Sequence, residues 1–242
     1  RDDEQEPKQR VAVIQFALKD AHCNGIVYGN SGGKDSALVG ILCKLACENT
    51  VGVAMPCQSS RNFGEDMEDA LAVAEQFHIE TLTVDLSDVK AALCSQIEPV
   101  QPLDQASLSN IAPRLRMTTL YAIAQSRGAL VAGTGNKCER YMGYFTKWGD
   151  GACDFNPIAD LTVTEIYEVL TYLKAPENII RKAPSAGLFE GQTDEAEMGV
   201  TYDEIEMYME TGSCGSDNDA RIHRAHAVTE HKRRMPLVYI DD

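Results

Sequence analysis

The sequence contains no apolar run that approaches the roughly 18 residues needed for a membrane span. It is also poor in basic residues, because 22 Lys and Arg face 37 Asp and Glu, a formal charge of −15. A sequence-independent nucleic-acid binder needs a basic face, so this deficit argues against that class. We therefore expect neither a membrane nor a nucleic acid among the partners.

The eight cysteines include no C-x-x-C pair, which argues against a zinc ribbon or a thioredoxin-type dithiol. Three histidines, His223, His226 and His231, recur on one predicted helix, but without a carboxylate or Cys at ligand spacing they argue against a metal site. Internal repeats and low-complexity segments are absent as well. We interpret the cysteines as free thiols in a reducing compartment, and we expect a cytoplasmic protein.

What is present is an ordinary globular composition, with 44% hydrophobic and 24% charged residues in 242 positions. That length is sufficient for one large domain, and no internal boundary is visible over residues 1–242. Apolar patterning predicts strands at 25–29, 51–55, 81–84 and 129–133, which alternate with helices at 3–22, 34–48, 65–77 and 87–97. This alternation predicts an α/β, doubly wound, mainly parallel sheet with helices on both faces.

The second half of the chain predicts longer helices and two irregular segments. We expect a helix within 107–127 whose regular part begins near Pro113, because proline favours the first turn. Residues 133–157 alternate glycines, aromatics and charges without a clean period, which is typical of ligand-facing segments. Residues 183–195 are predicted to form a mobile loop that closes over a site. Further helices are predicted at 164–173, 201–210 and 217–233.

One Gly-rich stretch lies between the first strand and the helix that follows it, and reads Gly29-Asn30-Ser31-Gly32-Gly33-Lys34-Asp35-Ser36. At such a junction, backbone N–H groups and the helix dipole hold phosphate. We expect Gly32 and Gly33 to adopt positive φ angles and to let phosphate approach the backbone. Asp35 fits beside phosphates if it holds Mg²⁺. The loop is not a Walker A motif, because Lys34 is followed by Asp35 rather than by Ser or Thr.

This stretch resembles the SGGxDS signature of the PP-loop ATP pyrophosphatases, whose fold is of the adenine nucleotide alpha hydrolase type. The resemblance implies that the loop grips the pyrophosphate of ATP and that the bond between the α and β phosphates is broken. Ligands of open parallel sheets bind beyond the carboxyl ends of the strands. We therefore expect the adenine to lie across the ends of the strands at 25–29 and 51–55.

Later motifs resemble those of the ammonia-dependent NAD⁺ synthetases, in one order through nearly the whole chain. They are Asn110-x-x-Pro113-Arg114-x-Arg116-Met117, Gly133-Thr134-Gly135-Asn136-Lys137, Gly143-Tyr144-Phe145-Thr146-Lys147-x-Gly149-Asp150-Gly151, Pro184-Ser185-Ala186, Gln192-Thr193-Asp194-Glu195 and His231-Lys232-Arg233-Arg234. The resemblance implies that ATP activates nicotinic acid adenine dinucleotide (deamido-NAD) as a NAD-adenylate and that ammonia then yields NAD⁺, with release of AMP and pyrophosphate. It also implies a homodimer. We expect free ammonia to be the nitrogen donor, because 242 residues leave no room for an added amidase domain.

The resemblance also implies roles for individual residues. It assigns the loop Gly29–Ser36, together with Thr134 and Ser185, to ATP, and it assigns Asp35 and Glu139 to Mg²⁺. The positions implied to contact deamido-NAD are Arg114, Lys147, Asp154, His231 and Lys232. Asp150 is the candidate for orienting or deprotonating ammonium as a general base, and Asp35 is the other catalytic candidate.

One position departs from the family pattern. Family members commonly carry an ATP-contacting Lys in a Leu-Thr-Lys element, and this sequence reads Leu161-Thr162-Val163 there. Valine cannot bind phosphate. Either another cation, such as Lys34 or Lys182, replaces it, or the affinity for ATP is reduced.

Two other functions compete with this interpretation. The first is a different PP-loop enzyme, such as the synthetase part of a GMP synthetase or a tRNA thiolase. Scattered cysteines and the charge of −15 argue against the thiolase. The second is a nucleotide-binding module that has lost catalysis, against which Asp35 and Glu139 argue. Release of pyrophosphate with an acid substrate separates an enzyme from such a module.

Overall fold

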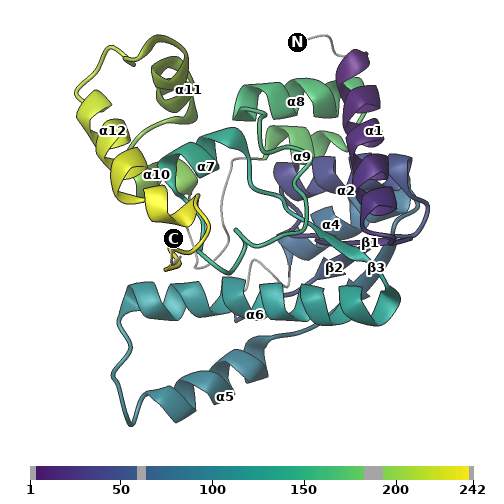
Figure 1. Cartoon of the computed structure of the whole chain (residues 1–242), viewed down its shortest axis with the longest axis horizontal. Coiled ribbons are helices and arrows are strands. Elements are labelled where there is room, and N and C mark those ends of the chain that lie inside the picture. Colours follow the sequence, from purple (N-terminus) through teal and green to yellow (C-terminus); the bar gives the residue numbers. More distant parts are fainter. Residues whose placement is uncertain (1–3, 59–63, 183–192, 240–242) are drawn as a thin grey trace.

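The centre of the computed structural model, which describes residues 4–58, 64–182 and 193–239, is a four-stranded parallel sheet of order β3-β2-β1-β4 (Figure 1). The four strands are β1 (Ile26–Gly29), β2 (Thr50–Ala54), β3 (Glu80–Thr83) and β4 (Leu130–Ala132). Val27 pairs with Val51 of β2 on one side and with Val131 of β4 on the other. The predicted parallel sheet is confirmed. Because the strands are parallel, their carboxyl ends lie at the same edge, where open sheets of this kind bind ligands.

Helices cover both faces of this sheet. Alternate residues of a strand point to opposite faces, so Ile26 packs with Ile14, Leu38 and Leu170 on one face, whereas Val27 packs with Ala124 on the other. The described helices are α1 (Gln5–Asp20), α2 (Lys34–Ala46), α4 (Glu65–Gln76), α5 (Ser87–Ile97), α6 (Gln105–Arg127), α7 (Lys137–Met142), α8 (Val163–Tyr172), α9 (Glu177–Arg181), α10 (Asp194–Met198), α11 (Tyr202–Thr211), α12 (Asp219–Val228) and the 3₁₀ turn η1 (Glu230–Lys232). The predicted doubly wound α/β architecture is therefore confirmed.

A third apolar cluster lies outside the sheet, among the C-terminal helices. Met142 of α7, Ile205 of α11 and Ile222 of α12 are buried together in it. These helices stand beside the carboxyl edge of the sheet, opposite α5 and α6 in the view of Figure 1. Within the described ranges, no helix is both long and apolar enough to cross a bilayer.

The structure corrects the predicted start of α6. The helix begins at Gln105 and not near Pro113, because the side chain of Asp104 accepts a hydrogen bond from the Ser107 N–H and caps it there. Pro113 lies inside the helix. Since proline has no N–H, the carbonyl of Ser109 one turn earlier lacks the usual helical donor.

Two further segments also differ from prediction. Residues 133–157 contain α7, which forms because Asn136 and Glu139 make a capping box and Gly143 ends the helix in the left-handed region. The helix predicted over 217–233 stops at Val228 and continues as η1. Most of the loop predicted at 183–195 lies outside the described residues, and α10 begins at Asp194.

Candidate active site

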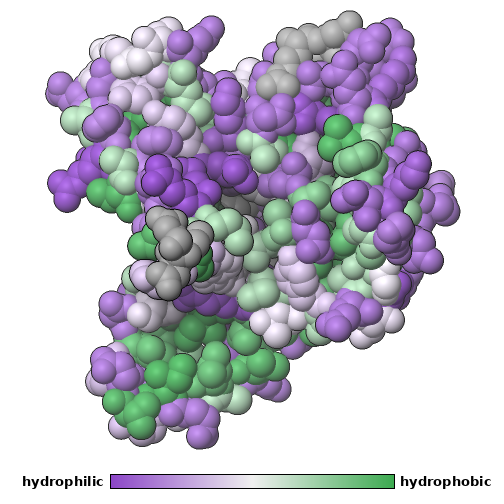
Figure 2. Space-filling view, in the orientation of Figure 1, coloured by the Kyte–Doolittle hydropathy of each residue, from purple (hydrophilic) through white to green (hydrophobic). Residues whose placement is uncertain are grey.

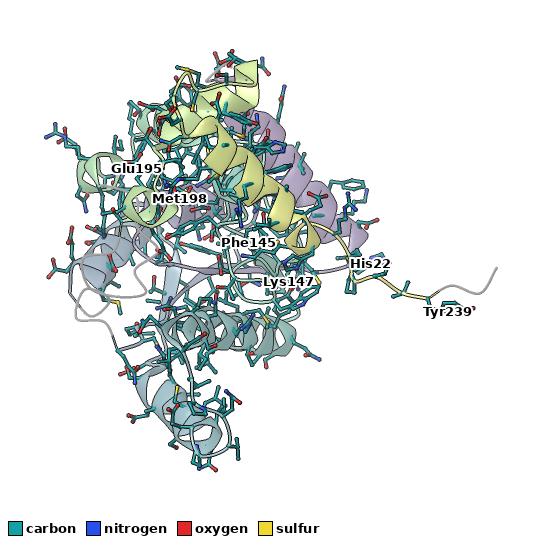
Figure 3. All side chains as sticks on the ribbon, turned by 90° about the vertical axis from the view of Figure 1, so that its left-hand side faces the viewer. His22, Phe145, Lys147, Glu195, Met198 and Tyr239 are labelled. Atoms are coloured by element: carbon teal, nitrogen blue, oxygen red, sulfur yellow. The ribbon has the colours of Figure 1, made fainter. Side chains whose placement is uncertain are left out.

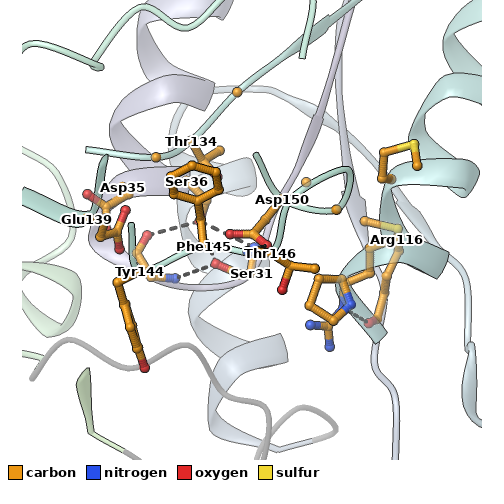
Figure 4. A pocket seen from close by; sticks show the side chains of 18 of the residues that line it. Ser31, Asp35, Ser36, Arg116, Thr134, Glu139, Tyr144, Phe145, Thr146 and Asp150 are labelled. Carbon is orange, nitrogen blue, oxygen red and sulfur yellow. Dashed lines mark hydrogen bonds between the residues drawn. The ribbon is translucent and has the colours of Figure 1, made fainter. Parts of the chain in front are cut away.

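A cavity of about 770 Å³ opens at the carboxyl edge of the sheet (Figure 4). Its walls come from the β1–α2 loop, the end of β2, α6, the β4–α7 connection and the turn around Asp150. Every predicted ATP-loop residue except Gly32 lines it, and Thr134 does so too. Ser185, the remaining predicted ATP residue, lies outside the described part of the chain.

The β1–α2 loop is held in a fixed shape by its own hydroxyl groups. The Ser31 and Ser36 hydroxyl oxygens are 3.1 Å apart, and the Ser36 hydroxyl donates to the Gly33 carbonyl at 3.0 Å. Gly32 has a φ of +75°, as expected, but Gly33 has a φ of −93° and caps α2, so a positive φ at Gly33 was wrong. The residues of the first turn of α2, Lys34 to Ser36, line the cavity, and the N-terminus of a helix has unpaired N–H groups that suit phosphate.

Asp35 and Glu139 form a pair of carboxylates on one wall of the cavity (Figure 4). Asn136 connects them, because its side-chain amide donates to Asp35 Oδ1 at 3.2 Å and its backbone N–H donates to Glu139 Oε2 at 2.9 Å. Burial, and next the negative charge of Asp35, raise the pKa of Glu139 well above its usual range, while Lys34 opposes the rise. The capping box that begins α7 also fixes the Glu139 side chain. The same interactions therefore form the helix and place this carboxylate beside Asp35.

This donor set fits a hard divalent cation. Two cavity-facing carboxylates suit Mg²⁺, which commonly takes one or two protein carboxylates and completes its shell with phosphate oxygens and water. In the described ranges, no group of three or more His, Cys, Asp or Glu side chains gathers as a closed metal cage. The pair therefore has the chemistry of a site that is completed by a phosphate ligand.

Lys34, Lys182 and Lys232 line the cavity, and Val163 does not. Val163 begins α8 and is buried in the apolar cluster that contains Cys138 and Tyr202. Lys34 Nζ lies 2.7 Å from Asp35 Oδ2. Lys182 Nζ lies 2.8 Å from Asp66 Oδ1 and 2.6 Å from Asp69 Oδ2.

Asp150 faces the cavity from a tight turn that follows Tyr144 and Phe145. Its Oδ1 accepts the Thr146 N–H at 2.9 Å. The residue is exposed on the cavity side, but neighbouring protein atoms partly desolvate its carboxylate, and this raises its pKa against the opposing effects of Thr146 and Lys232. A carboxylate with a raised pKa in a cavity has the properties of a general base.

Of the residues predicted to contact deamido-NAD, one lines the cavity and the others lie outside its lining. Lys232 lines the cavity and donates to the carbonyls of Gly143 and Phe145 at 2.8 and 2.7 Å, so it also holds the turn that carries Asp150. Arg114, Lys147 and His231 come together outside the cavity lining, where Arg114 donates to the Lys147 carbonyl and Lys147 Nζ lies 3.3 Å from His231 Nδ1. Figure 3 shows Lys147 close to Phe145, at the side of the molecule from which the C-terminal segment extends to Tyr239.

Asp154 is separate from the other predicted residues. Its Oδ2 accepts the Val131 N–H at 2.7 Å, and its Oδ1 accepts the Tyr121 hydroxyl at 3.2 Å. It does not line the cavity. These bonds give its carboxylate a role in holding the β4 backbone against α6.

The predicted site left out several residues that line the cavity, and Arg116, Tyr144 and Phe145 are the ones with chemical interest. Arg116 Nε donates to the Met55 carbonyl at 3.1 Å, and burial lowers the pKa of this guanidinium. Tyr144 and Phe145 line it as well, and the Tyr144 hydroxyl donates to Glu197 at 2.6 Å. In Figure 4, Arg116 lies across the cavity from Asp35 and Glu139. The available signals were the Arg114-x-Arg116 motif and the irregular pattern of residues 133–157.

Similarity to known proteins extends over nearly the whole chain. A family model described as NAD synthase matches residues 7–236. The chain belongs to the NAD synthase family. A member of that family from Carboxydothermus hydrogenoformans, described as an NH(3)-dependent NAD(+) synthetase, is 44% identical over 238 residues, which cover 97% of each chain.

Solved structures agree with the family assignment. A structure described as an NMN synthetase from Francisella tularensis superposes with a TM-score of 0.92 at 37% identity and covers 99% of both chains. An NH3-dependent NAD synthetase from Campylobacter jejuni, in complex with the nitrate ion, gives a TM-score of 0.83 at 31% identity and covers 99% of this chain and 100% of its own. The NAD synthase fold therefore accounts for the whole described chain.

Proposed function

We propose that this NAD synthase is an ammonia-dependent NAD⁺ synthetase, a ligase that uses ATP to convert the carboxylate of deamido-NAD into the amide of NAD⁺. One observation carries the proposal: a loop suited to phosphate and the half-buried carboxylate pair of Asp35 and Glu139 line one cavity. The names of the similar proteins supply the substrate. A passive nucleotide-binding module would need neither the carboxylate pair nor Asp150.

The chemistry follows from the poor reactivity of a carboxylate. A carboxylate oxygen of deamido-NAD attacks the α-phosphorus of ATP, and the bond to the bridging oxygen breaks, so pyrophosphate leaves. The N–H groups of the Ser31–Ser36 turn and the N-terminus of α2 bind the departing pyrophosphate. Asp35 and Glu139 would hold Mg²⁺, which, when bound, neutralises charge on the phosphates.

The second half-reaction forms the amide. Ammonia attacks the carbonyl carbon of the adenylate, the carbon–oxygen bond to AMP breaks, and AMP leaves. Asp150 is placed to orient the nucleophile and to take its proton, since its raised pKa brings it closer to working pH. Arg116, opposite the carboxylate pair, supplies fixed positive charge to the AMP side of the cavity.

We assign deamido-NAD to the side of the cavity that carries Lys232. The cluster of Arg114, Lys147 and His231 continues from this wall onto the surface, and cations at this place suit the phosphates of a dinucleotide. Asp154 is retained as a ribose-binding candidate, although its present hydrogen bonds are to Val131 and Tyr121.

The test is release of pyrophosphate with ATP, Mg²⁺ and ammonium, with and without deamido-NAD. We expect release to depend on deamido-NAD, with NAD⁺ formed in equal amount. The absence of pyrophosphate release with deamido-NAD and with any other acid would exclude a ligase and leave the binding module.

The Francisella structure, which is described as an NMN synthetase, raises nicotinic acid mononucleotide as a second candidate substrate. The mononucleotide carries the same nicotinate carboxylate but lacks the adenylate half. We expect kcat/KM for the dinucleotide to exceed that for the mononucleotide by at least about tenfold, because the surface cations contribute roughly 1–2 kcal/mol to the larger ligand. Arg114→Ala should remove most of this preference. A preference for the mononucleotide would reassign the protein as an NMN synthetase.

We also propose a homodimer that buries the exposed face of α5. None of the residues of α5 is buried, and its side chains Val89 and Leu93, with Val100 just beyond, leave 49%, 39% and 81% of their surface exposed. Figure 2 shows the corresponding apolar area where Figure 1 places α5. A contiguous apolar area of this kind marks an interaction site.

Light scattering should give a mass of twice the 26.5 kDa of one chain. Leu93→Asp should yield monomers, because it places a charge in the buried contact. Phe16→Asp on α1, where Phe16 is also exposed, is the matched control and should leave the dimer intact. A monomeric native protein would contradict the proposal.

Finally, we propose that residues 1–242 form one synthetase domain without an amidase and that the protein is cytoplasmic. The three apolar clusters adjoin one cavity, which supports a single unit. All eight cysteines are free thiols, which supports a reducing compartment.

A further inference from the structure

The Lys34 ammonium is a buried positive charge at the carboxylate pair. The side chain lines the cavity, yet the residue is only 4% exposed. Its Nζ donates to Asp35 Oδ2 at 2.7 Å and lies 5.6 Å from the centre of the Tyr202 ring. Those are the contacts that the described residues provide, although an ammonium carries three N–H donors. A buried donor without an acceptor costs free energy, so the remaining N–H groups favour a ligand in the cavity.

The Lys34 ammonium is hydrogen-bonded to a carboxylate oxygen of Asp35 that a metal ion would need as a ligand. Asp35 Oδ1 already accepts from Asn136 at 3.2 Å, and Oδ2 holds Lys34. Glu139 also feels the charge of Lys34. In the absence of a nucleotide, the pair is therefore partly neutralised by an internal cation, and a divalent ion that approaches it meets a fixed positive charge.

Lys182, a second lysine in the cavity lining, is not available for such a role. Its Nζ is within hydrogen-bonding distance of Asp66, Asp69 and, at 3.5 Å, the Gly32 carbonyl. These three acceptors match its three donors. Lys182 therefore ties the loop to α4, whereas Lys34 has donors left for a ligand.

We propose that Lys34 is a tethered cation that couples the binding of nucleotide and divalent metal. Without nucleotide, Lys34 holds Asp35 and weakens metal binding. The phosphates of a nucleotide draw the ammonium into the cavity, and Asp35 becomes free for the metal. The inference rests on the proposed function in that the anion is the polyphosphate of ATP, but it concerns binding and not amide formation.

The first measurement is the affinity of the nucleotide-free protein for Mn²⁺, followed by electron paramagnetic resonance of the free ion. Lys34→Gln should bind Mn²⁺ at least about tenfold more tightly than the native protein, because even at the dielectric constant of water a unit charge about 6 Å from a divalent ion has that effect. Lys44→Gln is the matched control. Lys44 lies on the same helix and pairs with Glu48 at the surface, so its loss changes the net charge equally but should leave the Mn²⁺ affinity unchanged.

The second measurement is the affinity for ATP in the presence of EDTA, by calorimetry. Lys34→Gln should bind metal-free ATP at least about tenfold more weakly, because the ammonium is lost as a phosphate ligand. Lys34→Arg keeps the charge and should behave as the native protein in both measurements, which separates loss of charge from disturbed packing. Circular dichroism of each variant verifies that it is folded.

Equal or weaker Mn²⁺ binding by folded Lys34→Gln would overturn the inference, as would unchanged affinity for metal-free ATP. Neither measurement uses deamido-NAD or ammonia. If no amide forms but both affinities change as expected, the proposed function fails and the coupling stands. If NAD⁺ forms and both affinities are unchanged, the coupling fails and the proposed function stands.

Discussion

Asp35→Asn should lower the rate of deamido-NAD-dependent pyrophosphate release by about 1,000-fold, because a bound metal contributes several kcal/mol to charge stabilisation in phosphoryl chemistry. Asparagine keeps the size of the side chain and the acceptor for the Asn136 amide. It removes the negative charge that would hold Mg²⁺ and that now neutralises Lys34. The measurement is initial rate against Mg²⁺ concentration, which should show a large fall in kcat that added Mg²⁺ does not restore.

Asp203→Asn provides the control for this result. Asp203 is an exposed acid in the first turn of α11, as Asp35 is an acid in the first turn of α2. If Asp35 acted only on the helix dipole, both substitutions would cost a few tenths to about 1 kcal/mol of stability and would leave the rate nearly unchanged. A rate for Asp35→Asn within tenfold of the native value would contradict its assignment to the metal.

Local sequence patterns predicted the parts of the site that lie on one short segment. The strand, the Gly-rich turn and the helix of residues 26–46 follow each other directly, so their spacing alone placed Ser31, Lys34 and Asp35 at the carboxyl edge of the sheet. The order of the four strands in the sheet was not predictable in this way, since β1 pairs with both β2 and β4. The family resemblance, and not the spacing, connected Glu139 to Asp35.

Side-chain contacts decided what the sequence patterns could not show. Pro113 suggested a helix start, but the Asp104 side chain caps α6 so that the helix begins at Gln105, eight residues before Pro113. Arg116 appeared in the sequence only as part of a family motif, whereas the fold places it against the Met55 carbonyl in the cavity. Asp154 matched a substrate-binding position, yet its carboxylate is hydrogen-bonded to the backbone of β4, a partner 23 positions away in the chain.

Gly32→Ala should lower the free energy of unfolding by about 2–5 kcal/mol and abolish detectable ATP binding. An alanine at the observed φ of +75° costs about 1–2 kcal/mol. Its Cβ would also lie 2.1 Å from the carbonyl oxygen of Asp66, so the backbone of α4 or of the loop must move, at a further cost of about 1–3 kcal/mol. Denaturant unfolding measures the first effect, and calorimetry with ATP measures the second.

Gly33→Ala tests whether the loop requires glycine at both positions or only at Gly32, where φ is positive. Gly33 has a φ of −93°, which alanine adopts without strain, and the nearest contact of an added Cβ would be the Ser31 hydroxyl at 3.4 Å. We therefore expect stability within about 1 kcal/mol of the native protein, with ATP binding weakened only as far as the methyl group hinders phosphate. Equal loss of stability in both variants would show that the positive φ of Gly32 and its contact with Asp66 do not determine the loop. A large loss for Gly32→Ala alone would show that one backbone angle, fixed against α4, holds the phosphate-binding turn open.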